Sequence, residues 1–219
     1  MQLNILDNYD IAKLKYISVA GHNSLSDYEI ADKVYRGRNC KINLETPVKL
    51  LSNDLQSYDY LYKEGFNVDI RPFEQRKEFG MYNQFGLHFT TLRYMPCFSY
   101  LGWSKIAEVI DYDKQNYQID KAEIQKSHSL TLGPIIGLKD HPCWKDPIYC
   151  EYAVCVYTHS LLNVFNQTDE LCRLAISINP HTIMDVRNPT KKLCDYAIKL
   201  NPQMRDIIEK ERNLGKILI

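Results

Sequence analysis

The stretches Leu171-Cys172-Arg173-Leu174-Ala175-Ile176 and Leu193-Cys194-Asp195-Tyr196-Ala197-Ile198 are two copies of one motif. Asn179-Pro180 and Asn201-Pro202 follow the two copies, and a degenerate earlier copy begins at Tyr149 with the same step. The step from Leu171 to Leu193 is the repeat interval of this chain. A period of about 22 residues is typical of stacked repeat architectures. The sequence therefore predicts a repeat array in the last third of the chain.

Each copy has the pattern of one amphipathic helix followed by a second helix. The apolar residues of the first helix are spaced to lie on one face: Leu171, Leu174, Ala175 and Ile178. Thr168 and Thr190 stand where a hydroxyl caps a helix N-terminus, and Pro180 and Pro202 suit the first position of the following helix. Helices this short need neighbours to be stable. We therefore predict three helical hairpins over 145–212, at 145–166, 167–188 and 189–212.

Residues 1–140 have a different pattern, with short apolar groups broken by Gly, Asn, Asp and Pro. The groups include candidate strands at Leu87–Thr91 and Ile106–Tyr112, and a candidate short helix at Leu44–Leu51. Residues 133–142 have the composition of a linker. The predicted fold class is α+β, with a mixed N-terminal domain over 1–140 followed by the helical array.

The composition excludes several broad classes of protein. The 219 residues include 27 Lys+Arg and 27 Asp+Glu, so no net field attracts nucleic acid or an anionic membrane. No apolar run reaches the roughly 20 residues that a membrane-spanning helix needs. The seven cysteines are odd in number, in a chain too long to need disulfides. We therefore expect a reducing, intracellular compartment, and no membrane partner.

Part of the chain resembles proteins of giant DNA viruses of amoebae. The segments Lys63–Asp69, Gly86–Thr91, Tyr100–Gly102 and Ile106–Val109 resemble a mimivirus-type domain that often precedes ankyrin repeats. The C-terminal units resemble a second repeat family of the same viruses, and together the two resemblances span roughly residues 60–210. His88 replaces the usual Tyr, and no ankyrin signature follows. The resemblance implies a viral protein in the host cytoplasm, the viral factory or the virion, and it supplies no activity.

An enzymatic alternative rests on a second, weaker resemblance. Tyr35-Arg36-Gly37 and Gly86–Thr91 look like the first two strands of ADP-ribosyltransferase-like folds. That resemblance implies that Arg36 and His88 hold NAD, while Glu108 orients a ribose hydroxyl. The competing interpretation makes Arg36 and Glu108 solvated strand residues and His88 a buried or edge histidine.

The cysteines also allow a metal hypothesis. His141, Cys143, Cys150 and Cys155 contain no Cys-x-x-Cys pair, which structural zinc sites usually have. Cys150, Cys172 and Cys194 share one repeat position, so we interpret them as small buried apolar residues. We expect neither a metal nor a cofactor.

Stacked helix pairs form extended surfaces that mostly bind other proteins. We therefore expect a non-enzymatic adaptor that binds a viral or host protein, with Arg173, Arg187, Asp195 and Lys199 at the contact surface. A further alternative is nucleic-acid binding through the basic residues of the last repeat, with RNA ahead of DNA. The oligomeric state is left open.

Overall fold

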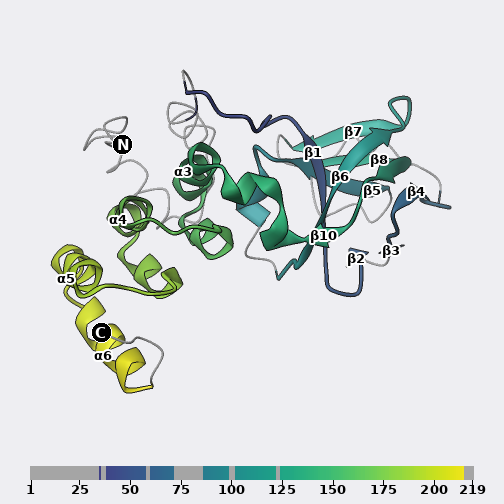
Figure 1. Ribbon diagram of the computed structural model, residues 1–219. Helices are drawn as coiled ribbons and strands as arrows, with labels where there is room; N and C mark the ends of the chain where they lie inside the picture. The colour runs from purple at the N-terminus through teal and green to yellow at the C-terminus, as the bar shows by residue number, and fades with distance from the viewer. Residues whose placement is uncertain are drawn as a thin grey trace. The chain divides into compact units, whose positions relative to one another are not determined.

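The computed structural model describes Tyr35 and residues 38–57, 60–71, 86–98, 102–121 and 124–214 (Figure 1). These residues belong to two compact units. One unit, Asn43–His141, is built on β-strands; the other contains the helices from Pro142 onward together with Tyr35 and residues 38–42. An antiparallel sheet and separate helices make the chain a mixed α+β protein, as predicted.

The strand unit contains an eight-stranded antiparallel sheet in the order β4-β9-β6-β1-β5-β8-β7, with β10 pairing β6 as well, and a separate two-stranded sheet, β2-β3. Its elements, which include two 3₁₀ helices labelled η, are β1 Pro47–Leu51, β2 Gln56–Ser57, β3 Tyr60–Leu61, β4 Gly65–Val68, β5 Leu87–Thr91, η1 Met95–Phe98, β6 Lys105–Tyr112, β7 Tyr117–Lys121, β8 Ile124–Ser127, β9 Ser129–Leu132, β10 Ile136–Gly137 and η2 Leu138–Asp140. The predicted strand Leu87–Thr91 is confirmed with the same bounds.

The helix predicted at Leu44–Leu51 is wrong, because Pro47–Leu51 forms strand β1. Val48 pairs with Thr90 of β5 on one edge and with Glu108 of β6 on the other, so β1 is an inner strand of the sheet. Pro47 is the first strand residue, a position at which proline is tolerated. A strand buried on both faces reads as a short, nearly continuous apolar run, which periodicity cannot distinguish from a helix.

The sheet curls around one hydrophobic core. His128 alone separates β8 from β9, yet β8 pairs with β5 and β7 while β9 pairs with β4 and β6. Strands from the two halves of the sheet are therefore joined by a single residue. The core that they enclose contains Leu51, Tyr62, Leu87, Phe89, Ala107, Val109, Leu130 and Leu132.

The charged residue Lys49 is enclosed with this core. Lys49 lies two positions before Leu51 in β1, so both side chains are on the same face of the sheet. Lys49 is 3% exposed; its Nζ donates to Ser57 Oγ at 2.8 Å and lies 4.5 Å from the centroid of the Tyr62 ring. Burial lowers the pKa of Lys49 from 10.5 to about 7.

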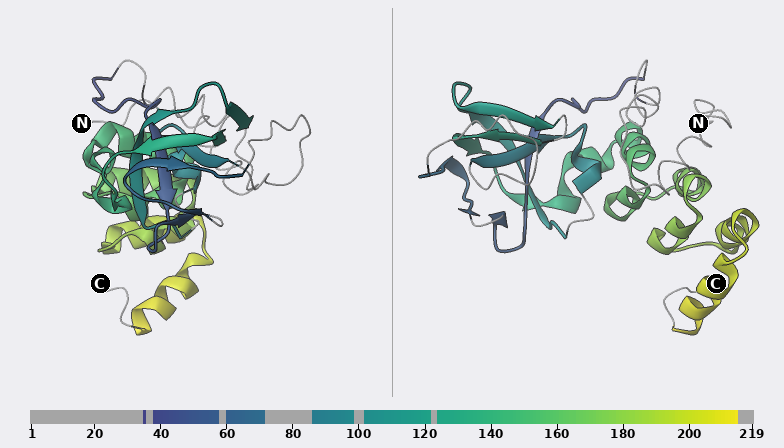
Figure 2. Two further views of the ribbon diagram at one scale, coloured as in Figure 1. Left: turned by 90° about the vertical axis from the view of Figure 1, so that its right-hand side faces the viewer. Right: turned by 180° about the vertical axis from the view of Figure 1, so that it is seen from behind.

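The other unit consists of short helices in succession (Figure 2). Its elements are η3 Pro142–Lys145, α3 Pro147–Val156, η4 Thr158–Asn163, α4 Asp169–Ile178, η5 Pro180–Asp185, α5 Lys191–Leu200 and α6 Met204–Asn213. Helix α4 packs against both α3 and α5, and η4 packs against η5. The sequence predicts a second α-helix in each of the three repeat units. In the first two units this element is instead a six-residue 3₁₀ helix, η4 or η5, and in the third unit it is the α-helix α6.

The predicted caps are confirmed at both helices of the close repeat. The Thr168 hydroxyl accepts from Leu171 N at 3.3 Å, and the Thr190 hydroxyl accepts from Leu193 N at 3.3 Å. Asn179 and Asn201 are the residues at which α4 and α5 end, and each side chain then accepts a backbone N–H from two positions further on. Helices α4 and α5 therefore begin and end at equivalent positions of the repeat.

Candidate docking surface

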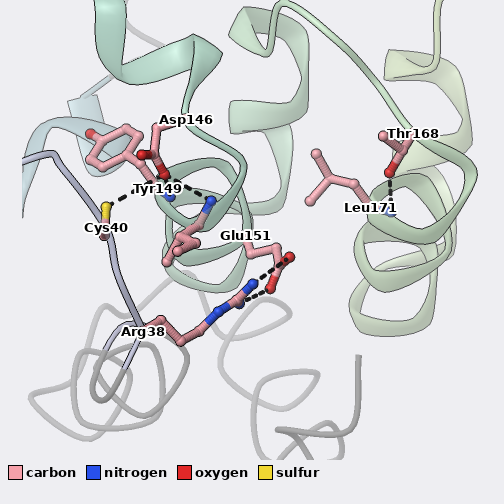
Figure 3. A network of polar contacts seen from close by, with 8 residues as sticks. Arg38, Cys40, Asp146, Tyr149, Glu151, Thr168 and Leu171 are labelled. Atoms are coloured by element: carbon pink, nitrogen blue, oxygen red, sulfur yellow. Dashed lines mark hydrogen bonds and ion pairs between the residues drawn. The ribbon is translucent and has the colours of Figure 1, made fainter. Parts of the chain in front are cut away.

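The N-terminal end of α3 is held by a segment that is distant from it in sequence (Figure 3). Asp146 caps α3 by accepting from Ile148 N and Tyr149 N, both at 2.9 Å. Cys40 Sγ donates to the same carboxylate at 3.4 Å, and Arg38 forms an ion pair with Glu151. Asp146 lies one repeat interval before Thr168, so it occupies the position of the repeat cap, although the Thr of the other two units is replaced by Asp.

The cysteines of the repeat position are buried thiols. Burial raises the pKa of Cys150 to about 12 and that of Cys172 to about 11, and it also raises the pKa of Cys194. Thiols of this kind are poor nucleophiles and poor metal ligands at neutral pH. Within the described ranges, no group of three or more His, Cys, Asp or Glu side chains is arranged to hold a metal ion.

The structure does not bring together the two described residues of the NAD hypothesis, His88 and Glu108. Arg36 lies outside the described residues. His88 is buried in β5, where desolvation lowers its pKa to about 4. Glu108 is in β6, on the other side of β1; its side chain is 56% exposed, and its Oε1 is 3.7 Å from Nε2 of His141. One of these two groups is therefore buried and the other faces solvent.

All four residues predicted to contact a partner are exposed, and three of them are on the helices α4 and α5. Arg173 is on α4, with its guanidinium carbon 5.3 Å from the centroid of the Tyr196 ring of α5. Asp195 and Lys199 are exposed on α5. These side chains are accessible on neighbouring helices.

The fourth residue, Arg187, is exposed and also binds the backbone of a neighbouring segment. Its Nη1 donates to the carbonyl of Phe165 at 3.1 Å, and its Nη2 donates to the carbonyl of Val164. Its backbone N–H donates to Oε1 of Gln167 at 2.9 Å. Arg187 therefore joins the segment after η5 to the segment after η4.

A second contact also ties η4 to η5. His159 Nδ1 and Asp185 Oδ2 are 2.6 Å apart, and this hydrogen bond raises the pKa of His159 above its ordinary 6.5. Gln167 Nε2 donates to the carbonyls of Leu161 and Asp185, at 2.8 and 3.1 Å. Side chains thus fix the backbone of both 3₁₀ helices and of the loop between η4 and α4.

The same part of the helical unit exposes large apolar side chains that motif analysis did not find. Leu162 of η4 is 46% exposed, Met184 of η5 is 36% exposed, and Phe165, just after η4, is 64% exposed. Leu162 and Met184 are separated by one repeat interval, so a comparison of equivalent repeat positions reveals the pair. We call Leu162, Phe165 and Met184, with the adjoining cations Lys145 and Arg187, the η4–η5 surface.

The two cations of this surface both contact Phe165, Lys145 at its ring and Arg187 at its backbone carbonyl. Lys145 Nζ is 5.6 Å from the centroid of the Phe165 ring, and Arg187 binds the Phe165 carbonyl. In the part of the chain that the structure describes, neither Lys145 nor Arg187 forms an ion pair with a carboxylate. The η4–η5 surface therefore combines apolar side chains with two cations that form no ion pair with a described carboxylate.

Comparison with known proteins identified no relative: the chain matches no protein family, no curated protein and no solved structure. Among the helices in the described ranges, none has both the length and the apolar character needed to cross a lipid bilayer.

Proposed function

We propose that this chain is a non-enzymatic adaptor that binds another protein through its helical unit. The observation that carries the proposal is the η4–η5 surface, where Leu162, Phe165 and Met184 are exposed on a backbone fixed by side-chain hydrogen bonds. Exposed apolar groups next to one another typically mark interaction sites. A fixed backbone loses little conformational entropy when a partner binds.

The adaptor proposal includes a repeat array over residues 145–212, with units at 145–166, 167–188 and 189–212. The caps Asp146, Thr168 and Thr190, each separated from the next by one repeat interval, support it. A second support is the position that holds buried Cys155 in α3, buried Ser177 in α4 and exposed Lys199 in α5. The residue at this position is apolar or small where it is buried and charged where it is exposed, as expected for equivalent positions of one repeat.

The resemblance to giant-virus proteins, made on sequence motifs, assigns the partner to the viral or host proteins of an infected cell. On this proposal the adaptor acts in the host cytoplasm, the viral factory or the virion. Arg173, Asp195 and Lys199 then form a second candidate contact surface on α4 and α5, distinct from the η4–η5 surface.

Affinity capture with point variants tests the function. The full chain and its Phe165→Asp, Arg173→Glu and Ile110→Asp variants are expressed in the same cells, and captured proteins are quantified against the unchanged chain. Ile110 is 68% exposed in β6 and serves as the matched control for placing a carboxylate at an exposed apolar position. We expect Phe165→Asp to lose a specific set of proteins that Ile110→Asp retains.

Other outcomes identify which part of the proposal fails. If captured proteins are lost only in Arg173→Glu, the partner binds the second candidate contact surface on α4 and α5. Identical capture by all variants contradicts the adaptor function. A rise in melting temperature on addition of NAD, removed by Glu108→Gln, supports the NAD-binding alternative instead.

A further inference from the structure

We propose that the η4–η5 surface binds an acidic segment of the partner, one in which apolar side chains alternate with Asp or Glu. This inference rests on the proposed adaptor function and specifies the chemistry of its partner. It depends on three properties of the surface: where its apolar side chains are placed, which charges adjoin them, and how those charges are already bonded.

The apolar part of the surface extends over two neighbouring 3₁₀ helices. Leu162 and Met184 occupy equivalent positions of η4 and η5, which pack against each other. Phe165 follows Leu162 closely in sequence, so its Cα lies within about 11 Å of the Cα of Leu162. From this packing and this short separation in sequence we infer that one bound segment can contact all three side chains.

The charges adjoining Phe165 are positive. Lys145 lies over the ring, and Arg187 uses its guanidinium on the carbonyls of Val164 and Phe165, which satisfies hydrogen bonds but does not neutralise charge. The nearby carboxylate of Asp185 is bonded to His159, whose raised pKa favours the imidazolium form. Complementary charge then requires carboxylates on the partner.

Two further carboxylates follow the surface in sequence. Asp169 and Glu170 are in the first turn of α4, where they face the positive end of the helix dipole. They are exposed, and neither pairs with Lys145 or Arg187. They leave the cations beside Phe165 available to a partner.

The same residues favour a protein segment over single-stranded RNA. Bases stack on open aromatic faces, but Lys145 already lies 5.6 Å from the centroid of the Phe165 ring. Leu162 and Met184 are flexible aliphatic groups that match apolar side chains better than base planes. Most non-specific affinity for nucleic acid comes from net positive charge, and this chain carries none.

The test is a selection of random peptides displayed on phage against the full chain. Enriched peptides are synthesised with a fluorescent label, and their affinities are measured by anisotropy for the unchanged chain and for Phe165→Ala, Lys145→Glu and Lys192→Glu. Phe165 and Lys145 are exposed, so neither substitution opens a cavity, and circular dichroism confirms that each variant folds. Lys192→Glu is the matched control, because it reverses an exposed lysine on α5 that belongs to neither candidate contact surface.

We expect the enriched peptides to carry Leu, Ile, Met or Phe flanked by Asp and Glu. Their affinity should fall about tenfold in Phe165→Ala, as for a central aromatic contact. Lys145→Glu should also weaken binding, added salt should weaken it further, and Lys192→Glu should leave it unchanged.

Enrichment of basic or uncharged peptides overturns the inference, as does equal affinity for all variants or a failure to enrich any sequence. Binding of labelled poly-uridine that Phe165→Ala removes, without acidic peptides, identifies RNA as the ligand instead. If affinity capture still loses a partner in Phe165→Asp while the acidic peptides fail, the adaptor function stands and only the partner's chemistry is wrong.

Discussion

Replacing Lys49 by Met isolates the effect of one buried amine on the stability of the strand unit. Methionine keeps most of the length of the aliphatic stem but removes the group that burial penalises. Lys49 Nζ is enclosed with the hydrophobic core, with Ser57 Oγ at 2.8 Å and the Tyr62 ring as its neighbours. We expect Lys49→Met to raise the free energy of unfolding at neutral pH and to lower it at high pH.

The sign follows from where the proton is bound. Between pH 7 and pH 10.5 the unfolded chain keeps the Lys49 proton and the folded chain releases it, so the free energy of unfolding rises with pH across this window. Below pH 7 both states are protonated, and this dependence ends. A displacement of the pKa from 10.5 to about 7 corresponds to about 5 kcal/mol over the window.

The variant also loses a hydrogen bond. Ser57 Oγ is left buried without its Lys49 partner, at a cost of about 1–3 kcal/mol. At pH 7, where the amine is already half deprotonated, we expect a net stabilisation of about 1–3 kcal/mol. Near pH 10.5 the charge penalty is almost gone, and the variant should be about 1–2 kcal/mol less stable than the unchanged chain.

Urea denaturation followed by circular dichroism at several pH values between these limits measures the effect. Lys139→Met is the control, since Lys139 is exposed on η2 in the same unit. The titration of tyrosines and cysteines affects both chains alike, so it cancels in the difference between their free energies of unfolding. A difference that stays constant with pH would refute the reasoning, because Lys49 would then titrate at its ordinary pKa in contact with water.

Three further predictions concern the helical unit. Thr190→Ala should lower the free energy of unfolding by about 1 kcal/mol, as measured by urea denaturation, whereas Thr190→Ser keeps the hydroxyl and should lose much less. Equal losses in the two variants would show that the hydroxyl does not cap α5. The raised pKa of His159 predicts stabilisation that is present below pH 6.5 and lost as pH rises through the folded-state pKa, so Asp185→Asn should remove that dependence and lower the pKa seen by NMR titration; an unshifted His159 contradicts it. Cys40 is half-buried while the other six thiols are buried, so a thiol reagent added to the native chain should label Cys40 first in mass spectra; simultaneous labelling is the contrary result.

Sequence analysis succeeded where structure is decided locally. The hydroxyls of Thr168 and Thr190, the apolar faces of α4 and α5, and the ends at Asn179 and Asn201 all depend on residues within one turn or two. The same period also marked the cap Asp146 and the exposed pair Leu162 and Met184, which only a comparison of equivalent positions shows. The 3₁₀ geometry of η4 and η5 was missed because apolar spacing in six residues does not separate it from one α-helical turn.

Sequence analysis failed where structure depends on distant partners. The segment Pro47–Leu51 is a strand because β5 and β6 pair with both of its edges, and neither strand is near it in sequence. The burial of Lys49 has no local signal either, since a lysine between Val48 and Leu50 looks like the solvated position of any amphipathic segment. Arg187 is an exposed cation, but its hydrogen bonds to the Val164 and Phe165 carbonyls depend on the fold and have no signal in the sequence.

The two units should acquire their structure at different speeds. Pairing Val48 with Glu108, and Gly65 with Leu132, requires closing long loops before any core is enclosed, whereas α4 packs chiefly against α3, η4, η5 and α5, which are near it in the chain. Rates of folding fall as the average separation between contacting residues grows. During synthesis, β1 therefore waits without its second neighbouring strand until residues beyond Tyr112 have left the ribosome, and its apolar residues are open to chaperones and to aggregation for that interval.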